Sequence, residues 1–283
     1  MPLDGSERAA VDAANASGRV PVLFVHGLWL THECWRDWRW LFESEGFAAL
    51  TPGWPGEATS IAEARTEPAR LSGLGITQVT EHCAELAAAL ERRPVVIGHS
   101  LGGLVAQQLA GRGVARAAVA VAPAPHRGVL PLPVSSVRAA WPALRDPRQR
   151  RRNVALTPAE FRYAFTNALR ADDADRFYDE QAVPAPGRPL FELALANLNP
   201  ATRARVDVRA PGRGPLLVIA GERDRVIPPV LARATYKRQR RNLDVTEYVV
   251  VPGHGHSLVA DAGWEQVAQL ALEFVQKHAS TDE

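Results

Sequence analysis

Short, mainly apolar segments recur along this chain, and helical patterns separate them. Six such segments lie at residues 20–25, 47–51, 94–98, 117–121, 215–220 and 245–251. Runs of this length and composition are typical of strands that are buried on both faces. Between them, hydrophobic residues recur at helical spacing, as at Val79, Cys83, Leu86 and Leu90. This alternation predicts the α/β fold class, a parallel sheet with helices on both faces.

One long segment interrupts the alternation, between about residues 125 and 207, and it is rich in proline and arginine. Its helical fragments lie at residues 135–144, 158–169 and 190–198. About 80 residues without a convincing strand are too many for a plain loop, so we predict a helical cap over residues 126–205. Residues 20–125 and 206–283 would then form the core, and residues 1–19 a flexible N-terminal tail.

The composition is that of an ordinary folded protein, with 46% hydrophobic and 23% charged residues. A formal net charge of +2 argues against a protein that binds nucleic acid or anionic membranes. The most basic run, residues 145–152, has two interpretations: a solvated loop, or a site for an anion or a partner.

Nothing in the chain indicates export or membrane insertion. The first 18 residues lack the cationic and apolar regions of a signal peptide. No apolar run approaches the roughly 18 to 20 residues of a membrane span, so we expect a cytoplasmic protein. Cys34 and Cys83 have no metal-ligand spacing and imply no disulfide framework, although a single bridge between them stays open.

The segment Gly98-His99-Ser100-Leu101-Gly102 matches the pattern G-x-S-x-G, between a buried strand and an amphipathic helix. In that context the pattern forms a sharp turn that raises the serine hydroxyl above the edge of the sheet. The glycines are needed because a side chain at either position would collide with the neighbouring strand or helix. We therefore predict that Ser100 is a nucleophile, whereas His99, inside the turn, is expected to be structural.

A serine hydroxyl needs a base to take its proton, and candidates follow the last two predicted strands. These positions lie at the same edge of the sheet as Ser100. Glu222 and Asp224 could each be the acid, and Asp224 is favoured because it directly precedes the turn that opens the next helix. His254 and His256 compete for the base, and His256 is favoured because it follows a glycine and precedes the final helix. The acid would hold the histidine tautomer.

The oxyanion of such a reaction needs two N–H donors. We expect the backbone N–H of Leu101, directly after the nucleophile, to be one of them. The loop after the first predicted strand should supply the other, because Gly27 permits a tight turn and Leu28 follows it. His26, which opens this loop, is expected to be structural rather than catalytic.

Together these motifs resemble the α/β-hydrolase superfamily, over residues 20 to about 278. The sequence is most similar to serine esterases, lipases and cofactor-free haloperoxidases. The resemblance implies an α/β-hydrolase fold: a mostly parallel eight-stranded sheet flanked by helices, here without its first strands because few residues precede Val20. It places the cap after the sixth strand of that pattern, here residues 117–121, and it implies no cofactor and no metal.

Aromatic side chains are expected around the site. Trp29 follows the oxyanion loop and should border the pocket, whereas Trp35 and Trp38, three residues apart, could belong to the core. The predicted substrate-binding residues are Trp29, His126, Trp141, Phe161 and Phe165. Such a pocket favours a hydrophobic acyl or aromatic substrate.

The leading hypothesis is a serine hydrolase that cleaves a carboxylic ester of a small molecule through an acyl-enzyme. A thioesterase, a cyclase or another acyl-transfer role in biosynthesis stays open, and so does a non-catalytic small-molecule sensor. Ser100 argues against haloalkane dehalogenases and epoxide hydrolases, the relatives that place a carboxylate at the nucleophile position. Hydroxynitrile lyases are disfavoured because Ser257 stands where they have lysine. The expected partner is a small acyl or ester substrate, with no nucleic acid and no membrane span, and the chain is expected to be a monomer or a homodimer.

Overall fold

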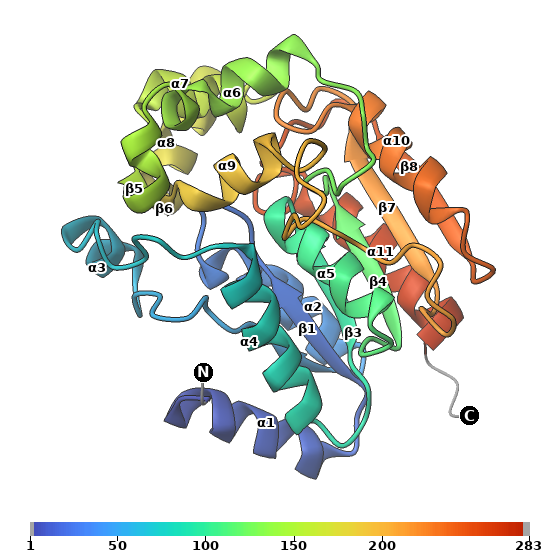
Figure 1. Cartoon of the computed structure of the whole chain (residues 1–283). Coiled ribbons are helices and arrows are strands. Elements are labelled where there is room, and N and C mark those ends of the chain that lie inside the picture. The colour runs from blue at the N-terminus through green and yellow to red at the C-terminus, as the bar shows by residue number, and fades with distance from the viewer. Residues whose placement is uncertain (1–2, 280–283) are drawn as a thin grey trace.

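The computed structural model describes residues 3–279, and its centre is a six-stranded sheet (Figure 1). The strand order is β2-β1-β3-β4-β7-β8, and every neighbouring pair is parallel. The strands are β1 (Pro21–Val25), β2 (Ala48–Leu50), β3 (Val95–His99), β4 (Ala117–Val121), β7 (Leu216–Gly221) and β8 (Thr246–Val251). All six apolar segments of the sequence therefore form strands of one parallel sheet, as predicted.

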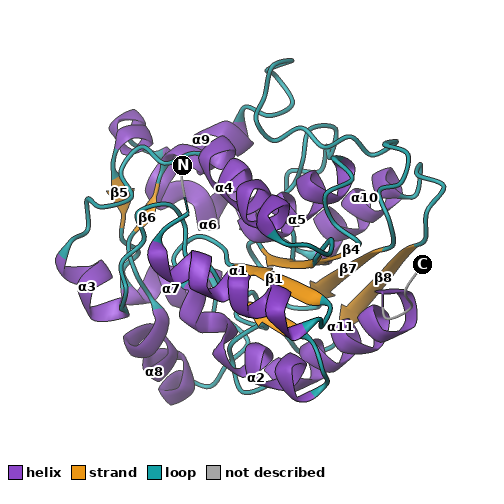
Figure 2. Cartoon of the chain, turned by 90° about the horizontal axis from the view of Figure 1, so that it is seen from below, coloured by secondary structure: helices purple, strands orange, loops and turns teal. Residues whose placement is uncertain are grey.

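Two layers of helices cover the sheet. On one face lie α4 (Ile76–Ala89), α5 (Leu101–Gly111) and α10 (Pro229–Gln239), and on the other α2 (Arg36–Ser44) and α11 (Trp264–Ala279) (Figure 2). A 3-10 turn, η1 (His32–Trp35), leads into α2, and the short α3 (Ile61–Thr66) follows β2. In the part of the chain that the structure describes, no helix is long and apolar enough to cross a membrane.

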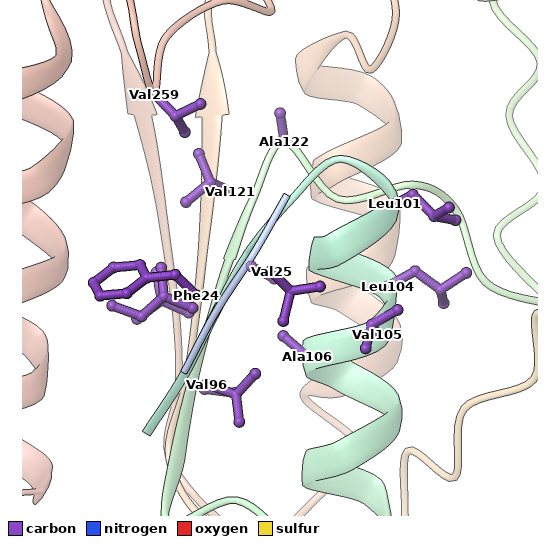
Figure 3. Packing of buried hydrophobic residues seen from close by; sticks show 14 of the residues in the cluster. Phe24, Val25, Val96, Leu101, Leu104, Val105, Ala106, Val121, Ala122 and Val259 are labelled. Carbon is purple, nitrogen blue, oxygen red and sulfur yellow. The ribbon is translucent and has the colours of Figure 1, made fainter. Parts of the chain in front are cut away.

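Strand β1 shows why these segments are apolar on both faces. Successive side chains of a strand point to opposite sides of the sheet, so Val25 points toward α5 and Phe24 away from it (Figure 3). The Phe24 ring packs against Trp35, Trp38 and Phe42. Trp35 and Trp38 are completely buried there, so they belong to the core rather than to a substrate pocket.

The predicted flexible tail is wrong for most of residues 1–19, because α1 (Gly5–Ser17) is a capped helix. Asp4 and Glu7 form a reciprocal capping box, which satisfies two N–H groups at the helix start. Val11 and Ala14 are buried, and α1 packs against β2 and α4. The alternation of alanine with charged residues, interpreted as a tail, is the pattern of an amphipathic surface helix.

Between β4 and β7 the chain leaves the sheet and forms a mainly helical segment, which corresponds to the predicted cap and is called the cap below. Its helices are α6 (Val134–Leu144), α7 (Pro158–Ala164), α8 (Ala171–Gln181) and α9 (Arg188–Ala194), with the 3-10 turn η2 (Pro147–Arg151). The cap also contains a two-residue antiparallel pair, β5 (Asn153–Val154) with β6 (Ala185–Pro186), which the sequence did not predict. This segment follows residues 117–121, which form the fourth strand along the part of the chain that the structure describes.

Candidate active site

Ser100 occupies a strained turn between β3 and α5. Its backbone angles, φ 53° and ψ −114°, lie outside the regions that non-glycine residues normally adopt. A Cβ on Gly98 would lie 2.0 Å from the carbonyl oxygen of Gly102, and one on Gly102 would lie 2.0 Å from that of Val25. Both glycines are therefore required for the close approach of strand and helix, as the sequence predicted.

Ser100, His256 and Asp224 lie in one hydrogen-bonded series. The Ser100 Oγ is 3.0 Å from His256 Nε2, and His256 Nδ1 is 2.7 Å from Asp224 Oδ2. Ser100 is 8% exposed, Asp224 3%, and His256 not at all. Because the carboxylate can only accept, Nδ1 carries the proton, and the lone pair of Nε2 faces the serine hydroxyl.

The other oxygen of Asp224 accepts hydrogen bonds from the backbone N–H groups of Val226 (2.8 Å) and Ile227 (2.7 Å). These bonds fix the orientation of the carboxyl group. Of the alternatives left open by the sequence, Glu222 is exposed and accepts from the Gly253 N–H. His254 bonds instead to backbone carbonyls of its own loop and of residue 263, so neither group is part of the series.

His99 packs against the histidine of this series. Its Nε2 donates to the His256 carbonyl oxygen at 3.0 Å, and the two ring centroids are 4.7 Å apart. Burial, with the nearby His256 as a second cause, holds the pKa of His99 well below its ordinary value. His99 is therefore a neutral structural residue, which agrees with its expected role.

The loop after β1 passes directly beside the nucleophile. A Cβ on Gly27 would lie 2.8 Å from the Cβ of Ser100, so only glycine allows this approach. Leu28 follows it, and both Leu28 and Leu101 are buried. The loop that holds the predicted donor Leu28 therefore passes beside Ser100, and the other predicted donor, Leu101, directly follows Ser100 in the sequence.

Backbone strain is concentrated at this edge of the sheet. Three non-glycine residues of the described chain have positive φ: Trp29 (63°), Ser100 (53°) and Ala122 (42°). They follow the neighbouring strands β1, β3 and β4, respectively. Strained residues of this kind cluster at functional sites, where the surrounding structure holds them in place.

Residues 22–270 match the profile of the alpha/beta hydrolase family. The chain belongs to this family. Among curated proteins, none matches the sequence of this α/β hydrolase.

Several solved structures share the fold of the hydrolase. One is a monoacylglycerol lipase from Paleococcus ferrophilus, with 21% identity, a TM-score of 0.64, and coverage of 92% of this chain and 95% of that one. A thermophilic esterase from Thermogutta terrifontis has 20% identity, a TM-score of 0.62, and coverage of 91% and 90%. A putative non-heme bromoperoxidase from Mycobacterium tuberculosis has 22% identity, a TM-score of 0.63, and coverage of 91% and 92%. At these identities the likeness establishes the fold alone.

A buried carboxylate that the sequence did not reveal supports the Gly27 loop. Glu57 Oε1 accepts from the backbone N–H and Nδ1 of His32, and Oε2 accepts from the Trp54 N–H. Glu57 Oε2 also lies 2.7 Å from His26 Nε2. Burial alone raises the pKa of Glu57, but the charge and hydrogen bonds of His26 and His32 outweigh it and hold that pKa far below its ordinary value.

His26 is therefore a structural residue of the hydrolase, as expected. It stacks on Trp54, and its Nδ1 donates to the Gly27 carbonyl oxygen. Glu57 lies in a segment rich in glycine and proline, whose composition indicates only a turn. No local signal could show that its carboxylate is buried.

Two predicted pocket residues form an apolar wall beside the series. The Phe165 ring meets His256 edge to face at 4.9 Å and Trp29 at 6.0 Å. Phe161 stacks on Phe165 at 4.6 Å but makes no ring contact with His256, so it lies behind the wall and supports it.

The other two predicted pocket residues are not brought to the series. Trp141 is 57% exposed on α6, so the expectation that it lines the pocket is not met. His126 is buried, and its Nδ1 donates to the Arg127 carbonyl oxygen. Among the described residues, no hydrogen bond, ion pair or ring contact joins His126 to Ser100 or His256.

The cap of the hydrolase is hydrogen-bonded to the loops that hold Trp29, Asp224 and His256. Trp29 Nε1 donates to the Val154 carbonyl oxygen in β5. The Phe165 carbonyl oxygen accepts from the N–H of Ser257, directly after His256. The Asn167 side chain, which sequence reasoning overlooked, donates to the carbonyl oxygen of Arg223, directly before Asp224. Cap position and site geometry are therefore linked.

The remaining chemistry-bearing groups lie apart from the series. Cys34 and Cys83 are separate buried thiols, and burial raises the pKa of Cys83 to about 12. Among the described residues, no three or more histidine, cysteine, aspartate or glutamate side chains are grouped to hold a metal ion.

Proposed function

We propose that this α/β hydrolase cleaves carboxylic esters of hydrophobic or aromatic small molecules through an acyl-enzyme on Ser100. The observation that carries the proposal is the buried series from Ser100 Oγ through His256 to Asp224, at the edge where three strained residues meet. A nucleophile, a base and an orienting acid in this order are the requirements of nucleophilic acyl transfer. The monoacylglycerol lipase and esterase structures with the same fold support ester hydrolysis as the reaction class.

In the first half of the reaction, the Ser100 hydroxyl gives its proton to His256 Nε2 as Oγ bonds to the ester carbonyl carbon. The carbonyl electron pair moves to oxygen, where the N–H groups of Leu28 and Leu101 hold the negative charge. Asp224, hydrogen-bonded to Nδ1, stabilises the imidazolium. The ester C–O bond then breaks, and Nε2 gives its proton to the departing alcohol.

In the second half, His256 takes a proton from water, and the resulting hydroxide attacks the acyl carbon. The bond to Ser100 Oγ breaks, and the proton on Nε2 returns to the serine. Acid and free enzyme result, with no change in oxidation state. The Phe165 ring beside His256, with the Trp29 ring against it, favours an apolar acyl group in this position.

A series of p-nitrophenyl esters from acetate to laurate tests the proposal. The wild-type protein should release p-nitrophenol, and Ser100→Ala should reduce the rate to that of buffer alone. Ser72→Ala, at an exposed serine, is the matched control and should keep the wild-type rate. Undiminished hydrolysis by Ser100→Ala would show that another group is the nucleophile.

Two further roles are compatible with the same series. A thioesterase or cyclase would form the same acyl-enzyme. A thioesterase would turn over acyl thioesters faster than oxygen esters. A cyclase or other acyl transferase would turn over faster with an added amine or alcohol acceptor than with water alone. A small-molecule sensor on this fold would bind apolar compounds, release no p-nitrophenol and form no adduct on Ser100.

A further inference from the structure

The cap carries a group of large apolar side chains on its outer surface. We call it the apolar patch, and it consists of Leu130, Leu132, Val134, Trp141, Leu195 and Leu198. Their exposed fractions range from 51% for Leu195 to 84% for Val134. Single exposed hydrophobic residues are ordinary on a protein surface, whereas a contiguous group marks a site of interaction.

The two chain segments of the apolar patch are fastened side by side. The side chain of Asn197 accepts from the Gly128 N–H at 2.7 Å and donates to the Val129 carbonyl oxygen at 2.8 Å. Leu195 and Leu198 flank this asparagine, and Leu130 directly follows Val129. Helix α6, with Val134 and Trp141, packs against α9 (Figure 1). The chain segments that carry the patch residues therefore lie side by side on the cap.

Arginines gather at the same part of the cap. Six exposed arginines, which we call the arginine rim, lie on α6 and in the segment that follows it: Arg138, Arg145, Arg148, Arg150, Arg151 and Arg152. The turn η2, which contains three of them, packs against both α6 and α9. Among the described residues, no carboxylate forms an ion pair with any member of the rim.

The charge of this surface differs from that of the whole chain. Residues 126–152 contain seven arginines and one acid, Asp146, whose side chain accepts from the Arg148 N–H. The formal net charge of the whole chain is only +2. The near-neutral charge of the whole chain argued against an anionic partner. That average hides the strongly basic segment of the cap at residues 126–152.

We propose that the apolar patch and the arginine rim dock the cap on an anionic lipid surface. Leucine and valine side chains would enter the boundary between headgroups and acyl chains, Trp141 would lie at the headgroup level, and the rim would meet lipid phosphates. Charge complementarity favours this occupant over a second copy of the chain, since a twofold contact through the patch would bring two arginine rims together. Docking depends on this surface alone and not on the proposed ester hydrolysis.

Docking would also serve the reaction proposed above. The cap is tied to the loops that hold Trp29, Asp224 and His256, so its outer surface is linked to the site beneath it. Apolar esters dissolve in bilayers, and a cap bound there would face its substrate. This consequence rests on the proposed function, whereas the binding itself does not.

Co-sedimentation of the full chain with lipid vesicles tests the proposal. Vesicles of phosphatidylcholine with about one-third phosphatidylglycerol should bind the wild-type protein at least about tenfold more strongly than pure phosphatidylcholine, and high salt should reduce that binding. Absence of binding to the anionic vesicles would overturn the proposal.

Matched variants separate the two parts of the surface. Two cap variants should each lower vesicle binding by about tenfold. One is the double variant Leu132→Ser with Val134→Ser, and the other is the triple variant Arg148→Gln, Arg150→Gln and Arg151→Gln. The controls are Leu243→Ser, and Arg233→Gln with Arg240→Gln and Arg241→Gln, all exposed positions on α10 or in the loop between α10 and β8. They should bind as the wild type does. Equal loss in cap and control variants would refute a specific surface.

Light scattering and ester hydrolysis are measured on the same variants. A wild-type dimer in light scattering that Leu132→Ser with Val134→Ser converts to a monomer, without vesicle binding, would assign the patch to a second copy and overturn the proposal. Hydrolysis of the soluble p-nitrophenyl acetate should be the same in all these variants. Vesicle binding without any ester hydrolysis would leave the docking surface standing and reject the proposed function.

Discussion

Asp224→Asn is the substitution whose effect the structure determines most closely. An asparagine amide has one acceptor oxygen and one donor nitrogen in place of two acceptors. The backbone N–H groups of Val226 and Ile227 both point at one oxygen of Asp224, so the amide oxygen must take that position. The amide nitrogen then faces His256 Nδ1. In the opposite orientation the amide N–H groups would face the backbone N–H groups of Val226 and Ile227, donor against donor.

This arrangement forces the wrong tautomer of His256. With an N–H donor opposite it, Nδ1 must accept, so the ring proton moves to Nε2 and occupies the lone pair that faces Ser100. The base can no longer take the serine proton. We expect kcat/KM to fall by about 10⁴-fold, equivalent to about 5.5 kcal/mol of transition-state stabilisation. The free energy of unfolding should change by only about 1 to 2 kcal/mol, since the backbone bonds are kept.

The assay is initial-rate hydrolysis of p-nitrophenyl butyrate, with thermal unfolding to check the fold. Glu222→Gln is the matched control, because this acid two residues away is exposed and its side chain accepts from the Gly253 N–H, outside the series. It should stay within about twofold of wild type. If Asp224→Asn keeps more than about a tenth of the wild-type kcat/KM, the tautomer argument is refuted.

Three other predictions concern stability and are read from urea unfolding. Gly98→Ala should lower the free energy of unfolding by at least about 3 kcal/mol, because its Cβ would lie 2.0 Å from the Gly102 carbonyl oxygen. Gly5→Ala is the control and should leave that free energy unchanged, because its Cβ would have nothing within 4 Å. Equal effects would contradict the close packing of the turn. Glu57→Ala removes a buried carboxylate that accepts from three N–H groups and should cost about 3 to 5 kcal/mol. A cost below about 1 kcal/mol would count against its support of the loop. Burial lowers the pKa of His126 to about 4, so between pH 6.5 and 4 the unfolded chain binds more protons than the folded one. The free energy of unfolding should therefore fall by up to about 3 kcal/mol as the pH is lowered through this range. His126→Asn should show a shallower fall, and an unchanged slope would reject the assignment to His126.

Local patterns predicted the six strands of the central sheet and the three residues of the hydrogen-bonded series. Strands buried on both faces need apolar side chains at every position, and this requirement is visible in any short window. The prediction of Ser100 as a nucleophile depends on a turn with glycines at fixed offsets, and the close contacts of Gly98 and Gly102 explain why that turn needs them. The choice of Asp224 and His256 followed from where the last two strands end, and parallel pairing brings those ends to one edge.

Features that depend on distant contacts could not be predicted in this way. Glu57 is buried because His26 and His32 converge on it, which a sequence window around residue 57 does not contain. Arg213, one of many arginines, is completely buried among carbonyl acceptors near β8, and composition gave no sign of it. Trp141 was expected in a pocket because it is aromatic, yet the direction of a cap side chain depends on how the cap helices pack.

The central claim is that Ser100 is an activated nucleophile, and labelling with a fluorophosphonate tests it most directly. Its phosphorus bonds to an activated serine oxygen with loss of fluoride, so intact-protein mass spectrometry should show one added probe in the wild type. Peptide mapping should place it on Ser100, and Ser100→Ala should show none. A wild-type protein that stays unlabelled, or a label on another residue, would contradict the account.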